Sequence, residues 1–242
     1  MLLWKSWFDL RLRFCYSAIV LLLVLGLFLS TYPTLNSLKD SLAQEELRRL
    51  AQDYHRFIEG TWFSADCMVL VIAAIVLGLG GVLVEKGGGA RLITLSLPAK
   101  RWKWAFTHAV ITSALLFLLA LVSTAALLLG SFLIGKSYPL NSALLGMLGA
   151  WLGCFPWIGL SLLLNSFFHS DMRSGLILFP AGAVGPQLLL SVSPSLYRWC
   201  PRQLANPGIW SQSFLWKPLL ISVVIGLIGI TLAAIRFTRE EC

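Results

Sequence analysis

The chain has 242 residues, of which 57% are apolar and 12% are charged, whereas about 25% of the residues of a soluble globular domain are charged. This composition excludes a soluble globular domain and is typical of a membrane protein. The net charge of +8 follows from the placement of Lys and Arg around membrane segments, so it does not call for a nucleic-acid partner.

Six stretches without a charged residue are each long enough for a helix to cross the hydrocarbon core. They lack the alternation of polar and apolar residues that marks the strands of a membrane barrel. We therefore predict an all-α polytopic membrane protein, with one transmembrane domain over 1–242 and both termini in the cytoplasm. The predicted transmembrane segments are 14–30, 67–84, 104–134, 143–168, 174–192 and 218–235.

The N-terminal segment 2–13 places Trp4, Trp7 and Phe8 beside Lys5 and Arg11. It is either an amphipathic helix lying on the inner leaflet or the charged flank of the first span, and the pattern favours neither. No small-x-small cleavage pattern follows the first span, so we expect a permanent anchor.

Segment 34–59 is the most polar part of the chain, with leucines and aromatic residues at helical spacing and charges between them. It predicts an amphipathic helix on the outer side of the membrane, with its apolar stripe on lipid or a partner.

The connection 85–103 determines the predicted orientation because it is short and strongly basic. Its positive residues are Lys86, Arg91, Lys100, Arg101 and Lys103. Short loops rich in Lys and Arg stay on the cytoplasmic side.

Residues 130–137, GSFLIGKS, match the spacing of a phosphate-binding loop, G-x-x-x-x-G-K-[ST]. Such a loop follows a strand and opens a helix, whereas this one comes at the end of a long apolar segment and is followed by Tyr138 and Pro139. We predict that Lys136 anchors a helix end and that the chain does not bind nucleotide.

The fifth predicted span is interrupted by FPAGAVGP, in which Pro180 and Pro186 disturb helical hydrogen bonding. Residues 193–217 are too polar to cross and predict a re-entrant outer cap with aromatic residues at the interface. Cys67 and Cys200 form the one plausible disulfide, although two separate thiols are favoured over a bridge.

Two ionisable residues lie near predicted spans. Asp66 precedes the second span, where an interfacial helix start is favoured over a proton or substrate site, and His108 follows Trp104, where a structural role is favoured. HSD at 169–171 cannot form a catalytic triad, because adjacent side chains point in different directions. The sequence shows no constellation of enzyme residues or metal ligands, so we expect that the chain is no enzyme by itself and holds no metal or cofactor.

The connection 85–103 resembles a segment of a known family. Membrane subunits of type-2 ABC exporters carry a Glu at the end of the second span and then an LLSLP-x-x-R box, and this chain has Glu85 and TLSLPAKR at 94–101. The resemblance extends to the expected six spans, the broken fifth span and the charged tail. One departure is the run Gly87–Gly89, where many relatives have other residues, so the docking geometry can differ.

The resemblance implies that this loop is a coupling helix that docks into a separate ATP-hydrolysing subunit. The residues implied in the contact are Glu85, Arg91, Leu97, Pro98, Lys100 and Arg101. It also implies a second permease copy or paralogue, membrane lipids around the chain, ATP and Mg²⁺ on the partner only, and a location in the plasma (inner) membrane.

The competing interpretation is a membrane scaffold or sensor that tethers a cytoplasmic protein without transport, with a basic loop that grips anionic lipid. The sequence leaves open the transported substrate, the choice between a homodimer and a heterodimer, the state of Cys67 and Cys200, and the binding of further outer subunits.

Overall fold

The computed structural model describes residues 2–37, 53–79, 101–168, 171–192, 201–204 and 216–239, and within these residues all regular structure is helical. The expected all-α class is therefore confirmed for the described part of the chain. Five helices are long and apolar enough to cross a membrane, so the chain is a multi-pass helical membrane protein. These spans are Leu10–Ser37, Tyr54–Gly78, Trp102–Leu133, Leu140–Phe168 and Lys217–Arg239.

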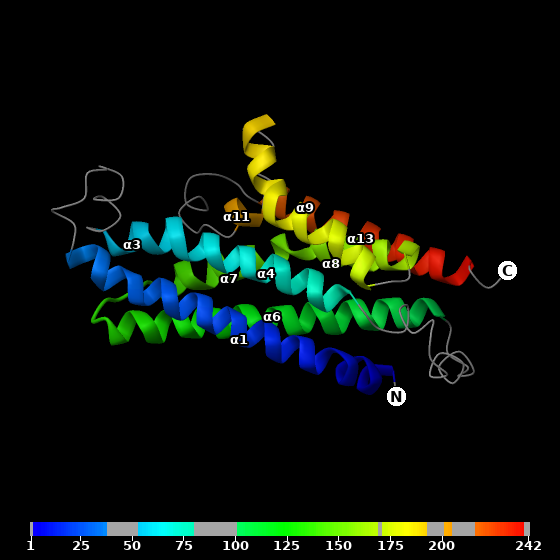
Figure 1. Ribbon diagram of the computed structural model, residues 1–242, viewed down its shortest axis with the longest axis horizontal. Helices are drawn as coiled ribbons and strands as arrows, with labels where there is room; N and C mark the ends of the chain where they lie inside the picture. Colours follow the sequence, from blue (N-terminus) through cyan, green and yellow to red (C-terminus); the bar gives the residue numbers. More distant parts are fainter. Residues whose placement is uncertain are drawn as a thin grey trace.

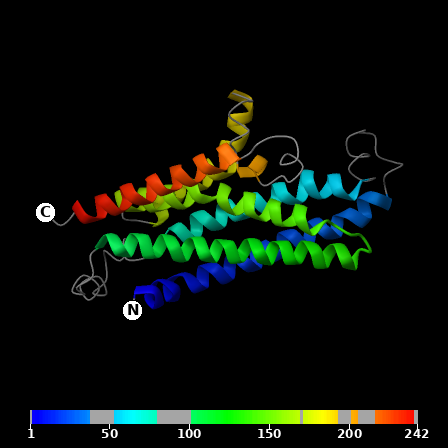
Figure 2. The same cartoon turned by 180° about the vertical axis from the view of Figure 1, so that it is seen from behind.

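The spans run side by side along the long axis of the molecule (Figure 1). Helix α13 (Trp216–Arg239) packs on α8 (Phe155–Phe168), and α1 (Leu2–Ser37) packs on α6 (Arg101–Leu133). Figures 1 and 2 both place the two chain termini at the same end of the bundle as the start of α6 and the end of α4 (Phe63–Gly78). The ends of α4 and α6 that flank residues 80–100 therefore lie at the same end of the bundle as the start of α1 and the end of α13.

Helix α1 is continuous from Leu2 through Ser37 and contains the predicted first span, 14–30, within the candidate span Leu10–Ser37. This continuity matches the interpretation of residues 2–13 as the flank of the first span. Pro33 lies inside the helix and does not end it, because neighbouring helices in a bundle accommodate the hydrogen bond that proline removes. Tyr32, on the same turn, holds it in place through an edge-on contact with Tyr54, with ring centroids 4.8 Å apart.

The second span begins at Tyr54, well before the predicted 67. Asp53 caps its first turn by accepting hydrogen bonds from the backbone N–H groups of His55 and Arg56. Helix α3 (Tyr54–Phe57) continues through a π-helical turn, η1 (Ile58–Trp62), into α4. Residues 54–59 thus belong to this span rather than to a separate outer helix, and 38–52 lie outside the described residues.

Helix α6 ends in a turn formed by the GSFLIGKS motif. Gly135 has φ +73°, the Gly135 N–H donates to the Phe132 carbonyl, and the Lys136 N–H donates to the Ser131 carbonyl. This pair of bonds is a Schellman C-cap. The motif therefore closes a helix and does not open one, as the sequence predicts. A helix C-terminus carries a partial negative charge, which disfavours binding of a phosphate.

Exchange of Gly135 for alanine should lower the free energy of unfolding by about 1–2 kcal/mol, because alanine is strained at positive φ. Lys136→Ala should change it by no more than about 0.5 kcal/mol, as an exposed substitution does. Thermal unfolding in detergent measures both. Loss of measurable ATP binding by the purified chain on Lys136→Ala would contradict the assignment of a helix cap.

The fourth span consists of two helices, α7 (Leu140–Gly153) and α8, separated at Cys154. The predicted span 143–168 lies within the candidate span Leu140–Phe168, which this break divides. Pro156 causes the break: it has no N–H to donate, and its ring clashes with the carbonyl four residues before it. The Cys154 N–H bonds instead to the Trp151 carbonyl at 3.2 Å.

The fifth predicted span corresponds to helix α9 (Asp171–Val192). The helix continues through both prolines, so the prediction that they interrupt it is wrong. Figure 1 shows its C-terminal part turning away from the bundle, and a bend is the usual effect of proline inside a helix. Its apolar part in the described residues, Arg173–Val184, is shorter than a span. Of the predicted outer cap, α11 (Pro201–Leu204) is described, and Leu204 packs with Leu152 and Leu219.

Helices α8 and α13 approach each other through glycines. A Cβ atom on Gly159 would lie 2.5 Å from the Gly226 carbonyl oxygen, and one on Gly226 would lie 2.6 Å from the Phe155 carbonyl oxygen. Gly229 faces Gly159 in the same contact. Small residues allow such close backbone packing in membranes, where van der Waals contact drives helix association.

Candidate functional site

Asp66 is buried inside the second span, and its side chain is 3% exposed. The Ser123 hydroxyl on α6 donates a hydrogen bond to Asp66 Oδ1 at 2.6 Å. The π-helical turn directly before α4 sets this orientation, because one extra residue rotates the following helix face by about 100°. An ionisable group at this depth is costly, so it is a candidate functional residue.

The sequence interpretation of Asp66 as a wet helix start is wrong. The helix begins twelve residues earlier, at Tyr54, and burial removes Asp66 from water. A search for charge-free windows ends every window at a charged residue, so it cannot place a carboxyl inside a span. The signal that could have found the longer helix is Asp53 followed by the apolar residues Tyr54, Phe57 and Ile58.

The Asp66 contact joins the two helices on either side of the predicted coupling loop. A second polar contact in this pair runs from the Thr112 hydroxyl to the Leu77 carbonyl at 3.3 Å. Both hydroxyls come from α6 and both partners from the second span, so α4 and α6 are joined near each end of their contact. Among the described residues, no group of three or more His, Cys, Asp and Glu lies close enough together to hold a metal ion.

The predicted coupling residues fall largely outside the described part of the chain. Arg101 is the first residue of α6, and the others lie in 80–100, outside the described residues: Glu85, Arg91, Leu97, Pro98 and Lys100. His108 is buried on α6 at 6% exposure. Cys67 is buried on α4, while Cys200 lies outside the described residues.

Two arginines that the sequence analysis did not single out bind the C-terminal ends of α4 and α8. The Arg13 guanidinium on α1 donates to the Val76 carbonyl at 3.1 Å and to the Leu79 carbonyl. Arg236 on α13 donates to the Ser166 carbonyl at 3.4 Å and lies over the Phe167 ring. Each arginine satisfies carbonyls at a helix C-terminus, where a positive charge is favourable. They therefore stabilise the ends of α4 and α8. The sequence shows that both residues are charged but does not indicate which carbonyls they bind.

A polar and aromatic contact joins helices at the other end of the bundle. Ser131 donates to the Leu127 carbonyl at 2.6 Å, so its oxygen accepts from the Tyr54 hydroxyl, also at 2.6 Å. Tyr138 lies between the third and fourth spans, with its ring 5.4 Å from that of His55. Burial raises the pKa of Tyr138, and the nearby negative charge of Glu59 raises that pKa further. Tyr138 therefore stays neutral at physiological pH and acts as a packing residue.

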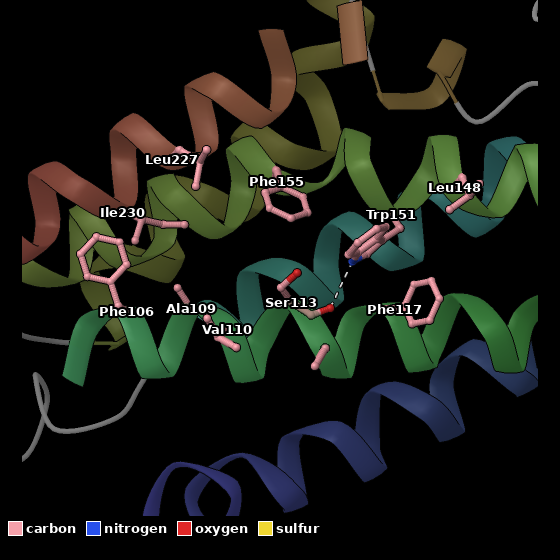
Figure 3. Close-up of a pocket in the computed structure, with 11 residues that line it drawn as sticks. Phe106, Ala109, Val110, Ser113, Phe117, Leu148, Trp151, Phe155, Leu227 and Ile230 are labelled. Atoms are coloured by element: carbon pink, nitrogen blue, oxygen red, sulfur yellow. Dashed lines mark hydrogen bonds between the residues drawn. The ribbon is translucent and has the colours of Figure 1, made fainter. Parts of the chain in front are cut away.

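A lateral pocket of about 660 Å³ lies between α6, α7, α8 and α13. Figure 3 shows Phe106, Val110 and Ser113 along one wall, with Trp151 opposite Phe117 toward the other end. The Trp151 ring N–H donates to the Ser113 carbonyl at 3.1 Å, which leaves the surface of the pocket almost wholly apolar. Helices α7 and α8 line this space from either side of the break at Cys154.

Comparison with protein-family models, curated proteins and solved structures gives no match to this chain.

Proposed function

We propose that the chain is the membrane-spanning subunit of an ATP-driven exporter of the type-2 ABC class, working with a separate ATP-hydrolysing subunit in the plasma (inner) membrane. The observation that carries the proposal is the resemblance at Glu85 and 94–101, in a basic connection that leaves the bundle beside both chain termini (Figure 1). A subunit docked on this connection would contact the ends of α4 and α6 together.

The contacts between α4 and α6 suggest how a force on the loop would enter the bundle. The hydrogen bonds from Ser123 to Asp66 and from Thr112 to Leu77 make the two helices a linked pair. Arg13 adds α1 to the end of that pair. Closure of the ATP-binding subunits would then move the pair as one unit, provided that ATP binds differently to the two states.

The proposal is tested by purifying tagged full-length protein from its own membranes in detergent and identifying bound proteins by mass spectrometry. We expect an ABC ATP-binding subunit to copurify with the unaltered chain and to be lost, by about tenfold or more, with Glu85→Ala and with Arg101→Glu, because a charge at a docking contact is worth 1.4 kcal/mol or more. Lys217→Glu is the matched control. Lys217 is an exposed cation at the start of α13, at the opposite end of the bundle from the start of α6.

The result also decides the competing interpretation. Copurification of an ATPase that is insensitive to both loop substitutions would contradict the assignment of the coupling loop. Copurification of a different cytoplasmic protein, without an ATPase, would favour the scaffold. Each variant must elute as a single species on size exclusion, so that loss of binding is not loss of folding.

A further inference from the structure

The lateral pocket has the shape of a groove with a buried floor and exposed rims. Ala109 and Ile230 on its floor are each 5% exposed, whereas Val110 and Leu227 on its rims are 62% and 48% exposed. All of its lining residues belong to membrane spans. The groove therefore opens sideways toward the hydrocarbon core of the bilayer and not toward water.

The helices around the groove cannot close it by moving together. The glycine contact at Gly159 and Gly226 already holds α13 against α8 at backbone distance. On the other side, the Trp151 hydrogen bond to Ser113 holds α7 against α6, and Phe117 and Phe155 pack edge-on against the same indole, at 4.9 Å and 5.6 Å between centroids. Because the groove is fixed, apolar and open to the bilayer, lipid acyl chains are the molecules available to fill it.

The length and position of the groove match one leaflet. From Phe106 to Phe117 it follows α6 for about 16 Å, at 1.5 Å per residue, and the hydrocarbon core is about 30 Å thick. It begins one helical turn after Lys103, an exposed cation at the end where α6 starts. Lys103 and Phe106 lie on the same face of the helix, because they are three residues apart.

We propose that this groove binds one acyl chain of an anionic phospholipid, with the phosphate of the headgroup at Lys103. The apolar lining takes the chain from the interface to the middle of the bilayer. The ammonium of Lys103 provides the charge that prefers an anionic headgroup to a zwitterionic one. Lys103 is the last residue of the connection 85–103, but none of the residues predicted to contact an ATP-hydrolysing subunit lines this site, and the site does not depend on the proposed function.

The test uses full-length protein exchanged into nanodiscs of equimolar phosphatidylcholine and phosphatidylglycerol, extracted mildly in detergent and analysed by native mass spectrometry. Ala114→Trp fills the groove from its exposed side. Ala125→Trp is the matched control, because Ala125 is an exposed alanine three turns farther along nearly the same face of α6 and does not line the groove.

We expect the unaltered chain and Ala125→Trp to retain one phosphatidylglycerol that Ala114→Trp retains at least about tenfold less often, the factor for losing contact with about two methylene groups. Lys103→Glu should abolish the preference for phosphatidylglycerol over phosphatidylcholine. Val110→Trp serves as a second obstructing variant if Ala114→Trp does not elute as a single folded species.

Equal lipid retention by the unaltered chain and a folded obstructing variant would overturn the proposal. So would a change from dimer to monomer in Ala114→Trp without loss of lipid, because a second copy of the chain would then cover the groove. Retention without headgroup preference, unaffected by Lys103→Glu, would overturn the assignment of the phosphate to Lys103.

Discussion

Replacement of Gly226 by alanine is expected to lower the free energy of unfolding by about 1–3 kcal/mol, the usual cost of overpacking. The new Cβ atom would lie 2.6 Å from the Phe155 carbonyl oxygen and 2.9 Å from Phe155 Cβ. The carbonyl oxygen is a backbone atom and the position of the Cβ atom is fixed by the backbone, so neither can move away by a change of rotamer. Helices α8 and α13 must therefore move apart along their whole contact, and Gly159→Ala should have the same effect.

A thiol-reactive dye can follow this unfolding, because Cys154 is fully buried at the break beside Phe155. The temperature at which the dye reacts should fall by several degrees in both variants. Gly26→Ala is the matched control, since a Cβ on Gly26 meets nothing within 4 Å. This control should be neutral or slightly stabilising, as alanine is in a helix. Unchanged unfolding in all three variants would mean that α8 and α13 do not pack through these glycines.

The sequence predicts the class of the fold and most of its spans, because long apolar stretches have one stable arrangement in lipid. It places helix ends poorly, and the two main errors have physical causes. The start at Tyr54 was missed because the helix contains the charges of Arg56, Glu59 and Asp66, which a charge-free window excludes. The break at Cys154 was missed because Pro156 lies inside an apolar stretch, where composition shows no boundary.

The residues that join the helices could not be predicted for a different reason. Whether Gly159 faces Gly226, or Arg13 reaches the end of α4, depends on the rotation and depth of each helix. Glycine and arginine are present in the sequence with nothing to indicate their partners. The carboxyl of Asp66 was noticed for its chemistry, but its partner Ser123 carries no signal in an apolar helix that contains several hydroxyl residues.

The second large effect is expected at Asp66 and Ser123. Ser123→Ala removes the donor and leaves a buried carboxyl, which should lower the free energy of unfolding by about 1–3 kcal/mol. In the double variant Asp66→Val, Ser123→Ala, both polar groups are gone, so stability should return close to that of the unaltered chain. Hydrogen bonds between membrane helices give coupling energies of about 0.6 kcal/mol and up to ~1.7 kcal/mol, and the carboxyl favours the upper part of this range.

Unfolding in dodecyl sulfate measures the stability of the four proteins of this double-mutant cycle: the unaltered chain, Asp66→Val, Ser123→Ala and the double variant. Ser30→Ala is the matched control, because the exposed Ser30 hydroxyl bonds only to the Leu27 carbonyl of its own helix and should contribute little. Additive effects of the two substitutions at Asp66 and Ser123 would mean that the hydrogen bond between α4 and α6 does not form in the membrane.

The double variant also separates stability from function. If Asp66 only holds α4 against α6, the stable double variant should retain the full ATP hydrolysis of the proposed complex with an ATP-hydrolysing subunit. If the carboxyl takes part in the movement of the α4 and α6 pair, hydrolysis should fall although the variant is as stable as the original. We expect the second result, because an apolar pair would serve packing better than a buried carboxyl, and a role in the proposed coupling of α4 to α6 would account for its presence.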